Sequence, residues 1–328
     1  MASINDVAQK AQVAKSTVSL VINNSGYVSK RTREKVEKAM QELNYVPSQL
    51  ARNFSTAKSN IVGIVMPDVV HPFFSTFIKH AEEKLYEKGY MTMVCGTVGR
   101  EKVEEKYLDM LNRRVMDGII MGVHSLDVEK YKETTRPIVT IDRYLDESIP
   151  MIRSDHRKAA EIAAQLVKEN NCKEVLHLTG SMVVDISSNE YYKHSKELLE
   201  ELGIKVHRLV IGSNSFSLTD YENAAQKVFE LYPNTDCILG VDMAILACMK
   251  EASTRGYEVP KDLKLIAYDG TYVTRLVDKT ITSIKQPIDL LAEEAVNTIV
   301  ALIEEQEVEN LNVVLDVSLQ QGETTIIE

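Results

Sequence analysis

Long apolar runs and paired cysteines are both missing from this chain of 328 residues. No stretch of roughly 18 apolar residues occurs, so neither a transmembrane helix nor a membrane partner is predicted. The N-terminus has no apolar signal core, and we therefore expect a cytoplasmic protein. The cysteines are scattered without a C-x-x-C pair, which favours buried, reduced thiols over disulfides or a metal site. They are Cys95, Cys172, Cys237 and Cys248.

Catalytic motifs are missing as well. The sequence contains no glycine-rich phosphate loop, no His-Glu-x-x-His, no Gly-x-Ser-x-Gly and no cysteine–histidine cluster with metal-ligand spacing. The seven histidines are dispersed, and a dispersed histidine is more often a surface or satisfied core residue than a catalyst. Carboxylates are abundant, but runs such as 101–105 and 197–201 are typical of solvated helix faces. We predict no enzyme, no cofactor and no metal.

Positive charge is concentrated at the start of the chain. Residues 1–59 contain nine Lys or Arg and four Asp or Glu, whereas the whole chain has a formal net charge of −10. A cationic head on an acidic body favours a polyanion-binding module joined to a part that need not touch the polyanion. An apolar share of 44% and a charged share of 26% indicate a folded chain, and its length suits about two or three domains.

Three short amphipathic helices are predicted within residues 1–46. Apolar residues at helical spacing mark a first helix near 4–11, a second over 15–23 and a third from about 30 to 44. The first two are separated by about three residues, as in a helix-turn-helix, whose second helix enters the major groove of DNA. A generic small helical domain is the alternative, but the cationic charge argues against it.

A hinge is predicted over residues 47–59. Pro47 lacks an N–H, which is tolerated at or just before the first turn of a helix, so a short helix is expected at 48–55. Isolated helices below roughly 12 residues are marginal in water because nucleation is costly. We therefore expect the hinge to become ordered only on DNA.

From residue 60 onward, short apolar runs alternate with amphipathic helices. This alternation predicts βαβ units and parallel sheets. Strands are predicted at residues 61–66, 90–95, 118–121, 138–141, 175–179, 205–210, 236–239 and 263–267. The pattern starts again after the fourth strand, which predicts two doubly wound α/β halves with a cleft between them. Such sheets place ligands outside the carboxyl ends of their strands.

Six stretches near the N-terminus carry a family pattern: Ile4-Asn-Asp-Val-Ala, Lys15-Ser-Thr-Val-Ser, Val21-Ile-Asn, Thr32-Arg-Glu-Lys-Val, Leu43-Asn-Tyr-Val-Pro47 and Leu50-Ala-Arg52. Residues 1–59 thereby resemble the headpiece of the LacI–GalR family of bacterial transcription regulators, and the resemblance continues over essentially the whole chain. It implies a repressor that binds double-stranded, pseudo-palindromic operator DNA and responds to a small effector. The later stretches 267–271 and 282–288 look most like regulators of sucrose-type or other sugar operons.

The domain organisation that the resemblance implies has three parts. A helix-turn-helix domain covers 1–46, a hinge covers 47–59, and an effector-binding and dimerisation domain of periplasmic-binding-protein type covers 60–328. Three crossovers join its subdomains, which comprise about 60–156 plus 286–317 and about 157–285 plus 318–328. The sequence has no leucine heptad after the last sheet, which relatives that form tetramers carry, so a homodimer is expected.

DNA contacts are implied residue by residue. Lys15, Ser16 and Leu20 take the positions that read base edges in the major groove. Leu20 can offer only apolar contact, for example with a thymine methyl; the alternative is that it packs beside the groove. Contacts to the DNA backbone, or positioning of the helix on it, are implied for Thr17, Ser19, Asn23, Arg31 and Arg52.

Phe54 takes the hinge position that in the family carries an apolar wedge, usually leucine. Two such wedges from a dimer open a base step in the minor groove, and phenylalanine is among the side chains that do so in proteins. The alternative is that Phe54 folds back onto the effector domain and anchors the linker there.

An effector site is implied at the carboxyl ends of the strands. His71, Phe73 and Phe74 match the loop that closes over the ligand, and Asp269 matches an aspartate that bonds ligand hydroxyls. Carboxylates and aromatic rings suit a polyhydroxylated ligand, because carboxylates accept from hydroxyls and rings stack on the apolar face of a sugar. The other residues assigned to this site are Asp142, Arg143, Asp155, Glu190 and Asp242.

Glu190 departs from the family pattern, which has a ligand-clamping arginine there. Losing a five-donor fork and gaining a carboxylate reverses the local charge. Three interpretations stay open: a sugar or sugar derivative held by a shifted set of residues, a ligand with positive charge or extra donors, or control by a protein co-effector of the phosphocarrier type. A sugar-binding protein or enzyme with no role on DNA is the least favoured reading.

Overall fold

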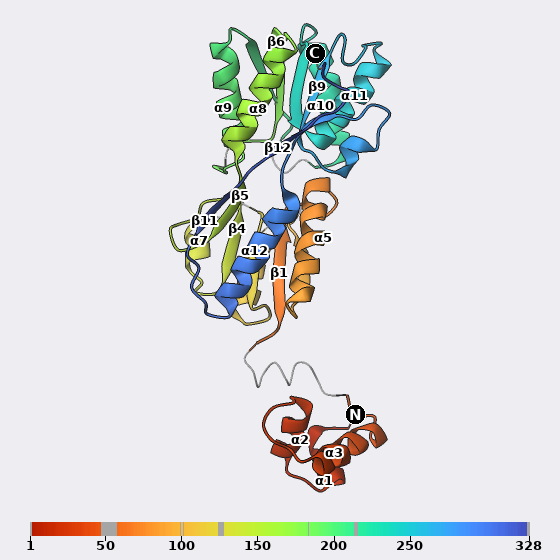
Figure 1. The fold of residues 1–328 in the computed structure, drawn as a ribbon, viewed down its shortest axis with the longest axis vertical. Helices are drawn as coiled ribbons and strands as arrows, with labels where there is room; N and C mark the ends of the chain where they lie inside the picture. The colour runs from red at the N-terminus through yellow and green to blue at the C-terminus, as the bar shows by residue number, and fades with distance from the viewer. Residues whose placement is uncertain are drawn as a thin grey trace. The chain divides into compact units, whose positions relative to one another are not determined.

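The computed structural model describes residues 2–46, 58–98, 100, 102–123, 128–182, 184–212 and 216–326. The chain forms two compact units, residues 1–60 and 61–328 (Figure 1). No helix in the described ranges is both long enough and apolar enough to cross a membrane. The predicted hinge helix at 48–55 lies outside the described residues, and so do Pro47, Arg52 and Phe54.

The first unit consists of α1 (Ile4–Ala11), α2 (Lys15–Ile22) and α3 (Lys30–Glu42). Ser3 begins α1 with a capping box: its hydroxyl accepts from the Asp6 N–H, and its own N–H donates to the Asp6 carboxylate at 2.7 Å. This reciprocal pair satisfies two N–H groups that the helix leaves free. One apolar face of each of the three helices then packs into a common core. Its buried members are Val7, Ala8, Ala11, Val18, Val21, Val36 and Ala39.

The first half of the second unit contains a sheet in which every described pairing is parallel. Its order is β11-β5-β4-β3-β1-β2. The strands are β1 (Ile61–Met66), β2 (Met91–Gly96), β3 (Gly118–Met121), β4 (Ile138–Ile141), β5 (Met151–Ser154) and β11 (Asn312–Leu315).

Helices cover both faces of this sheet. One face packs against α5 (Pro72–Glu87) and α12 (Ile288–Ile303) (Figure 1). The other face packs against α6 (Val103–Asn112) and α7 (Val128–Lys132). Gly118 lets α12 approach closely, because a Cβ there would lie 2.9 Å from side-chain atoms of Ile299. The carboxyl ends of the strands are left for loops, as in other doubly wound sheets.

The second half repeats this plan with the order β12-β10-β9-β8-β6-β7. The strands are β6 (Glu174–Thr179), β7 (Lys205–Val210), β8 (Cys237–Val241), β9 (Lys264–Asp269), β10 (Thr282–Lys285) and β12 (Ser318–Gln320). Among the pairings in the described part of this sheet, only that of β10 with β12 is antiparallel. Two apolar layers flank the sheet, and its helices are α8 (His156–Glu169), α9 (Asn189–Glu201), α10 (Leu218–Leu231) and α11 (Asp242–Thr254).

Both predicted α/β halves and the predicted three-helix headpiece are confirmed. The four cysteines are free and buried, as predicted. The chain passes between the halves three times, after β5, after β10 and after β11.

Four strands, however, were not predicted: β5, β10, β11 and β12. The first two are four-residue segments that carry a charged residue, and the other two alternate in polarity or exposure, so none shows the apolar run that marked the others.

Candidate DNA-binding and effector sites

The outer face of α2 carries the residues predicted to meet DNA. Lys15 and Ser16 are exposed at its start, while Thr17 and Ser19 are partly covered. The Asn23 side-chain amide donates to the Ser19 hydroxyl at 3.3 Å. Ser19 and Asn23 therefore support one another across one helical turn, which fits the positioning role that the resemblance implies for them.

Leu20 has a structural contact in addition to its place on this face. A Cβ built on Gly26 would lie 3.3 Å from Leu20 Cδ2, and the Ser25 N–H donates to the Leu20 carbonyl at 3.1 Å. Gly26 has φ +68°, a conformation that side chains rarely adopt. The loop after α2 thus packs on part of Leu20. The next residue, Tyr27, is 94% exposed and was not singled out from the sequence.

The cations of the first unit differ in how they are paired. Glu42 lies 2.8 Å from the Lys10 ammonium and 4.0 Å from that of Lys38, and the Lys10 contact lowers the pKa of the Glu42 carboxyl. Lys15 and Arg31 are exposed, and within residues 2–46 neither has an ion-pair partner. These two side chains therefore keep their full charge for a polyanion, whereas Lys10 is partly neutralised.

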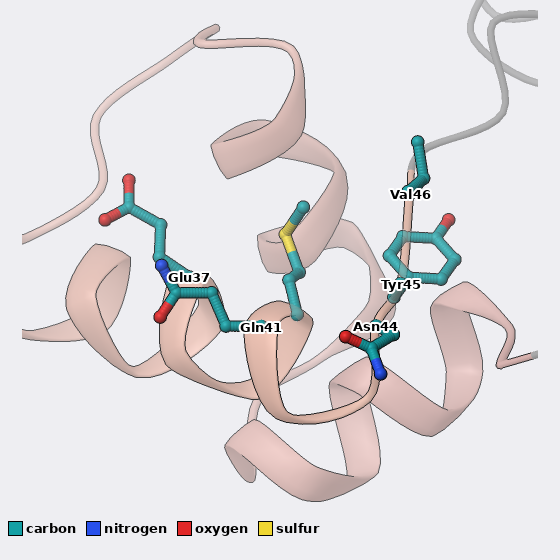
Figure 2. A pocket seen from close by; sticks show the side chains of 6 residues that line it. Glu37, Gln41, Asn44, Tyr45 and Val46 are labelled. Carbon is teal, nitrogen blue, oxygen red and sulfur yellow. The ribbon is translucent and has the colours of Figure 1, made fainter.

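An open pocket of about 510 Å³ lies at the end of α3 (Figure 2). It is lined by Glu37, Met40, Gln41, Asn44, Tyr45 and Val46. None of these residues belongs to the predicted DNA or effector sites, and its shallow, solvent-open form gives no enclosed binding surface. This pocket therefore does not locate the chemistry of the protein.

In the second unit, a chain of hydrogen bonds joins the two halves. His156 Nε2 lies 2.8 Å from Asp142 Oδ1, at the end of β4, and His156 Nδ1 lies 2.5 Å from the hydroxyl of Tyr268 on β9. His156 is fully buried. Because its two ring nitrogens are both occupied, this histidine acts as a bridge between the carboxyl ends of two sheets.

A second bridge involves Asp269. The Gln286 amide donates to Asp269 Oδ1 at 2.7 Å, and the Ser154 hydroxyl donates to Gln286 Oε1 at 2.7 Å. Burial raises the pKa of the Asp269 carboxyl well above its usual range, and the neighbouring Asp242 raises it further. Asp269 also has φ +120°, and strained backbone of this kind clusters at binding sites.

Four of the predicted effector residues also have partners within the protein. Asp242 is buried and accepts from Gly270 N, Thr271 N and Thr271 Oγ1, so it holds the loop after β9. Burial raises its pKa to about 6. Asp155 caps α8 by accepting from Lys158 N at 2.9 Å.

The other two lie in the first half. The Arg143 guanidinium lies over the Tyr131 ring at 5.6 Å, and Phe73 belongs to the apolar layer under α5 and α12.

An aromatic contact crosses between the halves. The His71 ring, before α5, lies 5.4 Å from Phe74 and 5.6 Å from Phe216, which is in the second half. Burial lowers the pKa of His71 to about 4, so the imidazole is neutral at pH 7. His71 Nδ1 is buried and has no hydrogen-bond partner among the described residues. The sequence placed His71 and Phe74 here but not Phe216.

Tyr191, in the first turn of α9, is stacked on Tyr268 with 4.3 Å between ring centroids and 9° between planes. Its hydroxyl is buried and finds no partner in the described part of the chain. Burial raises the pKa of Tyr191 far above its usual value, so the hydroxyl keeps its proton and remains a donor.

From the sequence, Glu190 was expected to reverse the charge of the effector site, but the structure places a cation beside it. Its Oε2 lies 4.0 Å from Arg153 Nη1, on β5 of the other half. An arginine is therefore present beside the carboxylate, but it comes from a strand that the sequence pattern did not reveal. His156, Tyr191, Tyr268 and Gln286 were missed likewise. Their common signal, a polar or aromatic residue near the carboxyl end of a strand or the start of a helix, is too general to select them.

The two units together define a class: a small helix-turn-helix domain joined to a two-domain α/β body of binding-protein type. The family model described as "Bacterial regulatory proteins, lacI family" matches residues 3–48. The model described as "Periplasmic binding proteins and sugar binding domain of LacI family" matches residues 59–320. The chain belongs to the LacI family of bacterial transcription regulators, which are DNA-binding repressors and not enzymes.

Individual relatives agree along the full length. The chain is 30% identical to a ribose operon repressor of Halalkalibacterium halodurans over 99% of this chain and 97% of the relative. It is 31% identical to a sucrose operon repressor of Streptococcus mutans over 99% of both. Among solved structures, the lac repressor dimer bound to operator and the anti-inducer ONPF superposes with a TM-score of 0.85 at 23% identity over 99% of both chains. That likeness shows the fold.

Proposed function

We propose that this chain is a dimeric repressor of a carbohydrate-utilisation operon, and that a sugar held between the halves of the second unit changes its affinity for the operator. LacI-family repressors bind operator DNA as dimers and bind sugar effectors, and the similar relatives are named for ribose and sucrose operons. The residues predicted to contact DNA and effector, given above, are part of this proposal.

For the DNA side, the support comes from α2. Lys15 and Ser16 are exposed on the helix that a helix-turn-helix places in the major groove, and Lys15 is not neutralised by a described ion pair. Arg31, exposed at the start of α3, adds a cation suited to a phosphate. Leu20 offers its remaining apolar surface to a base.

For the effector side, one observation carries the proposal. Among the buried polar atoms that have no hydrogen-bond partner within the described residues are His71 Nδ1, Arg153 Nε and Tyr191 Oη. They come from both halves, around the carboxyl ends of the strands. An unsatisfied buried donor or acceptor costs roughly 1–3 kcal/mol, so a ligand with several hydroxyls that meets them all recovers that free energy. The His71, Phe74 and Phe216 rings supply the apolar surface that a sugar ring needs.

The pairing of Glu190 with Arg153 weighs against the alternative of a cationic ligand. An unpaired Glu190 would attract positive charge, whereas a carboxylate 4.0 Å from a guanidinium is already partly neutralised. For the homodimer, the support is the family together with exposed apolar residues in the second half, where Leu276 is 75% and Tyr272 is 52% exposed.

The experiment is a thermal-shift screen of the full chain against ribose, xylulose, sucrose and cellobiose, followed by operator binding with and without each hit. A ligand that binds only the folded state raises the melting temperature by mass action. We expect at least one sugar to stabilise the protein and to change its operator affinity. Stabilisation by none, together with a change in operator affinity on adding a phosphocarrier protein, would favour the protein co-effector instead.

A further inference from the structure

Arg153 is placed where it can reach a ligand from the first half. It lies on β5, next to Ser154, whose hydroxyl donates to Gln286 and so joins the Asp269 bridge. Met151, two residues earlier and on the same face of the strand, contacts the Ser187 hydroxyl through its sulfur. The Ser187 N–H in turn donates to the Asp142 carbonyl at 2.7 Å. Arg153, whose side chain is 20% exposed, thus lies at the junction of the two halves.

The guanidinium of Arg153 is only partly used. Its contact with Glu190 is long, at 4.0 Å between Nη1 and Oε2, and the Glu190 side chain is 44% exposed. Its Nε is buried and has no acceptor within the described residues. A guanidinium presents five donors in a rigid fork. The Nε donor is therefore available to a ligand that reaches Arg153.

We propose that Arg153 is a specificity-determining residue of the effector site, which binds ligand hydroxyls while Glu190 orients its guanidinium. The Arg153–Glu190 pair also disfavours a negatively charged ligand. The Glu190 carboxylate lies beside the guanidinium, so a phosphate brought to Arg153 meets a like charge at short range. The ligand that fits this arrangement is an uncharged polyol rather than its phosphate ester. This inference rests on the proposed function, because it assumes a sugar effector.

The test uses the full-length protein and the sugar that stabilises the wild type most, among ribose, xylulose, sucrose and cellobiose, together with the phosphate ester of that sugar. Titration calorimetry gives Kd for wild type, Arg153→Met, Arg153→Lys and Glu190→Gln. Arg153→Met keeps most of the side-chain stem and removes the fork. Arg113→Met is the matched control, since Arg113 also pairs with a carboxylate, Asp109, but on the surface of α6.

We expect Arg153→Met to weaken binding of the neutral sugar about ten- to hundred-fold, the usual cost of a lost charge-assisted hydrogen bond. The sugar affinity of Arg153→Lys should lie between those of wild type and Arg153→Met, because lysine keeps the charge but not the planar fork. Wild type should prefer the neutral sugar to its ester, and Glu190→Gln should narrow that preference by removing one like charge. A merely structural role for Glu190 would not change the preference between the two ligands.

Three results would overturn the inference. The first is an unchanged sugar Kd in Arg153→Met, matching the Arg113→Met control. The second is a wild type that prefers the ester. The third is an altered ligand-free operator affinity in Arg153→Met with the sugar Kd intact, which would make the pair a latch between the halves. If no sugar binds the wild type, the proposed function itself fails and the inference fails with it.

Discussion

The ring of Tyr191 lies flat on the ring of Tyr268, with 4.3 Å between centroids and 9° between planes. The two residues belong to α9 and β9, and the Tyr268 hydroxyl contacts His156 at the start of α8. Stacked aromatic pairs contribute beyond the area that they bury, by about 0.5–1.5 kcal/mol. The stack therefore fixes the first turn of α9, which also carries Glu190, against the sheet.

Two substitutions separate the contribution of the Tyr191 ring from that of its hydroxyl. Tyr191→Phe removes only the unpartnered hydroxyl, so we expect unchanged or slightly higher thermal stability and weaker sugar binding. Tyr191→Ala also removes the ring and should cost about 3 kcal/mol or more, as for other large aromatic residues in cores. Melting temperature and sugar Kd measured on both variants check this. Full sugar affinity in Tyr191→Phe would show that the hydroxyl does not meet the ligand.

Leu20 tests the recognition helix. Leu20→Arg gives α2 a side chain that can bond both acceptors of a guanine edge, a contact worth about 1–3 kcal/mol of discrimination. A selection from randomised operators should then show one position changed to a G·C pair. Because the loop at Gly26 packs on Leu20, Leu20→Ala is the control for lost packing. The recognition assignment would be wrong if Leu20→Arg and wild type selected the same sequences.

The hinge wedge remains a prediction from the sequence, since Phe54 lies outside the described residues. Phe54→Ala should lose most specific operator affinity and most operator bending. Unstacking a base step costs a few kcal/mol, and the cost is offset only if a wedge and the bend create new contacts. Non-specific binding should barely change because it depends on phosphate contacts. Energy transfer across an end-labelled operator measures the bend, and equal bending by both proteins would favour the linker-anchor reading.

His71 should make the second unit sensitive to acid. The unfolded chain protonates this imidazole near pH 6.5, whereas burial lowers the pKa in the folded protein to about 4. Between these values the unfolded state binds more protons, so the stability present above pH 6.5 is lost as the pH falls towards 4. At about pH 5 the loss attributable to His71 is roughly 2 kcal/mol.

His71→Phe provides the comparison, because it keeps an aromatic ring beside Phe74 and Phe216 but cannot titrate. Buried His177, with its pKa lowered to about 3, contributes in the same direction in both proteins. We expect the melting temperature of His71→Phe to fall less than that of wild type between pH 7 and pH 5. Parallel decreases in the two proteins would mean that His71 is not the group responsible.

Local sequence patterns were sufficient to predict much of the fold of this protein. The spacing of apolar residues within 4–11, 15–23 and 30–44 determined the three-helix headpiece, since a short helix buries one face whatever lies beyond it. Apolar runs predicted eight of the strands, and six of these lie inside the sheets, where a strand buried on both faces is largely apolar. The sequence alone also showed that position 190 carries a glutamate.

What the sequence left undecided is which residues meet. Arg153 and Glu190 are far apart in the chain, and β5 shows no apolar run because its third residue is the arginine itself. Their contact depends on the order of strands in two sheets and on the crossovers that bring both carboxyl edges together. Such contacts between distant segments are decided by the packing of whole layers, which no local pattern encodes. For this reason the sequence alone indicated a reversed charge, and only the tertiary structure supplied the arginine that balances it.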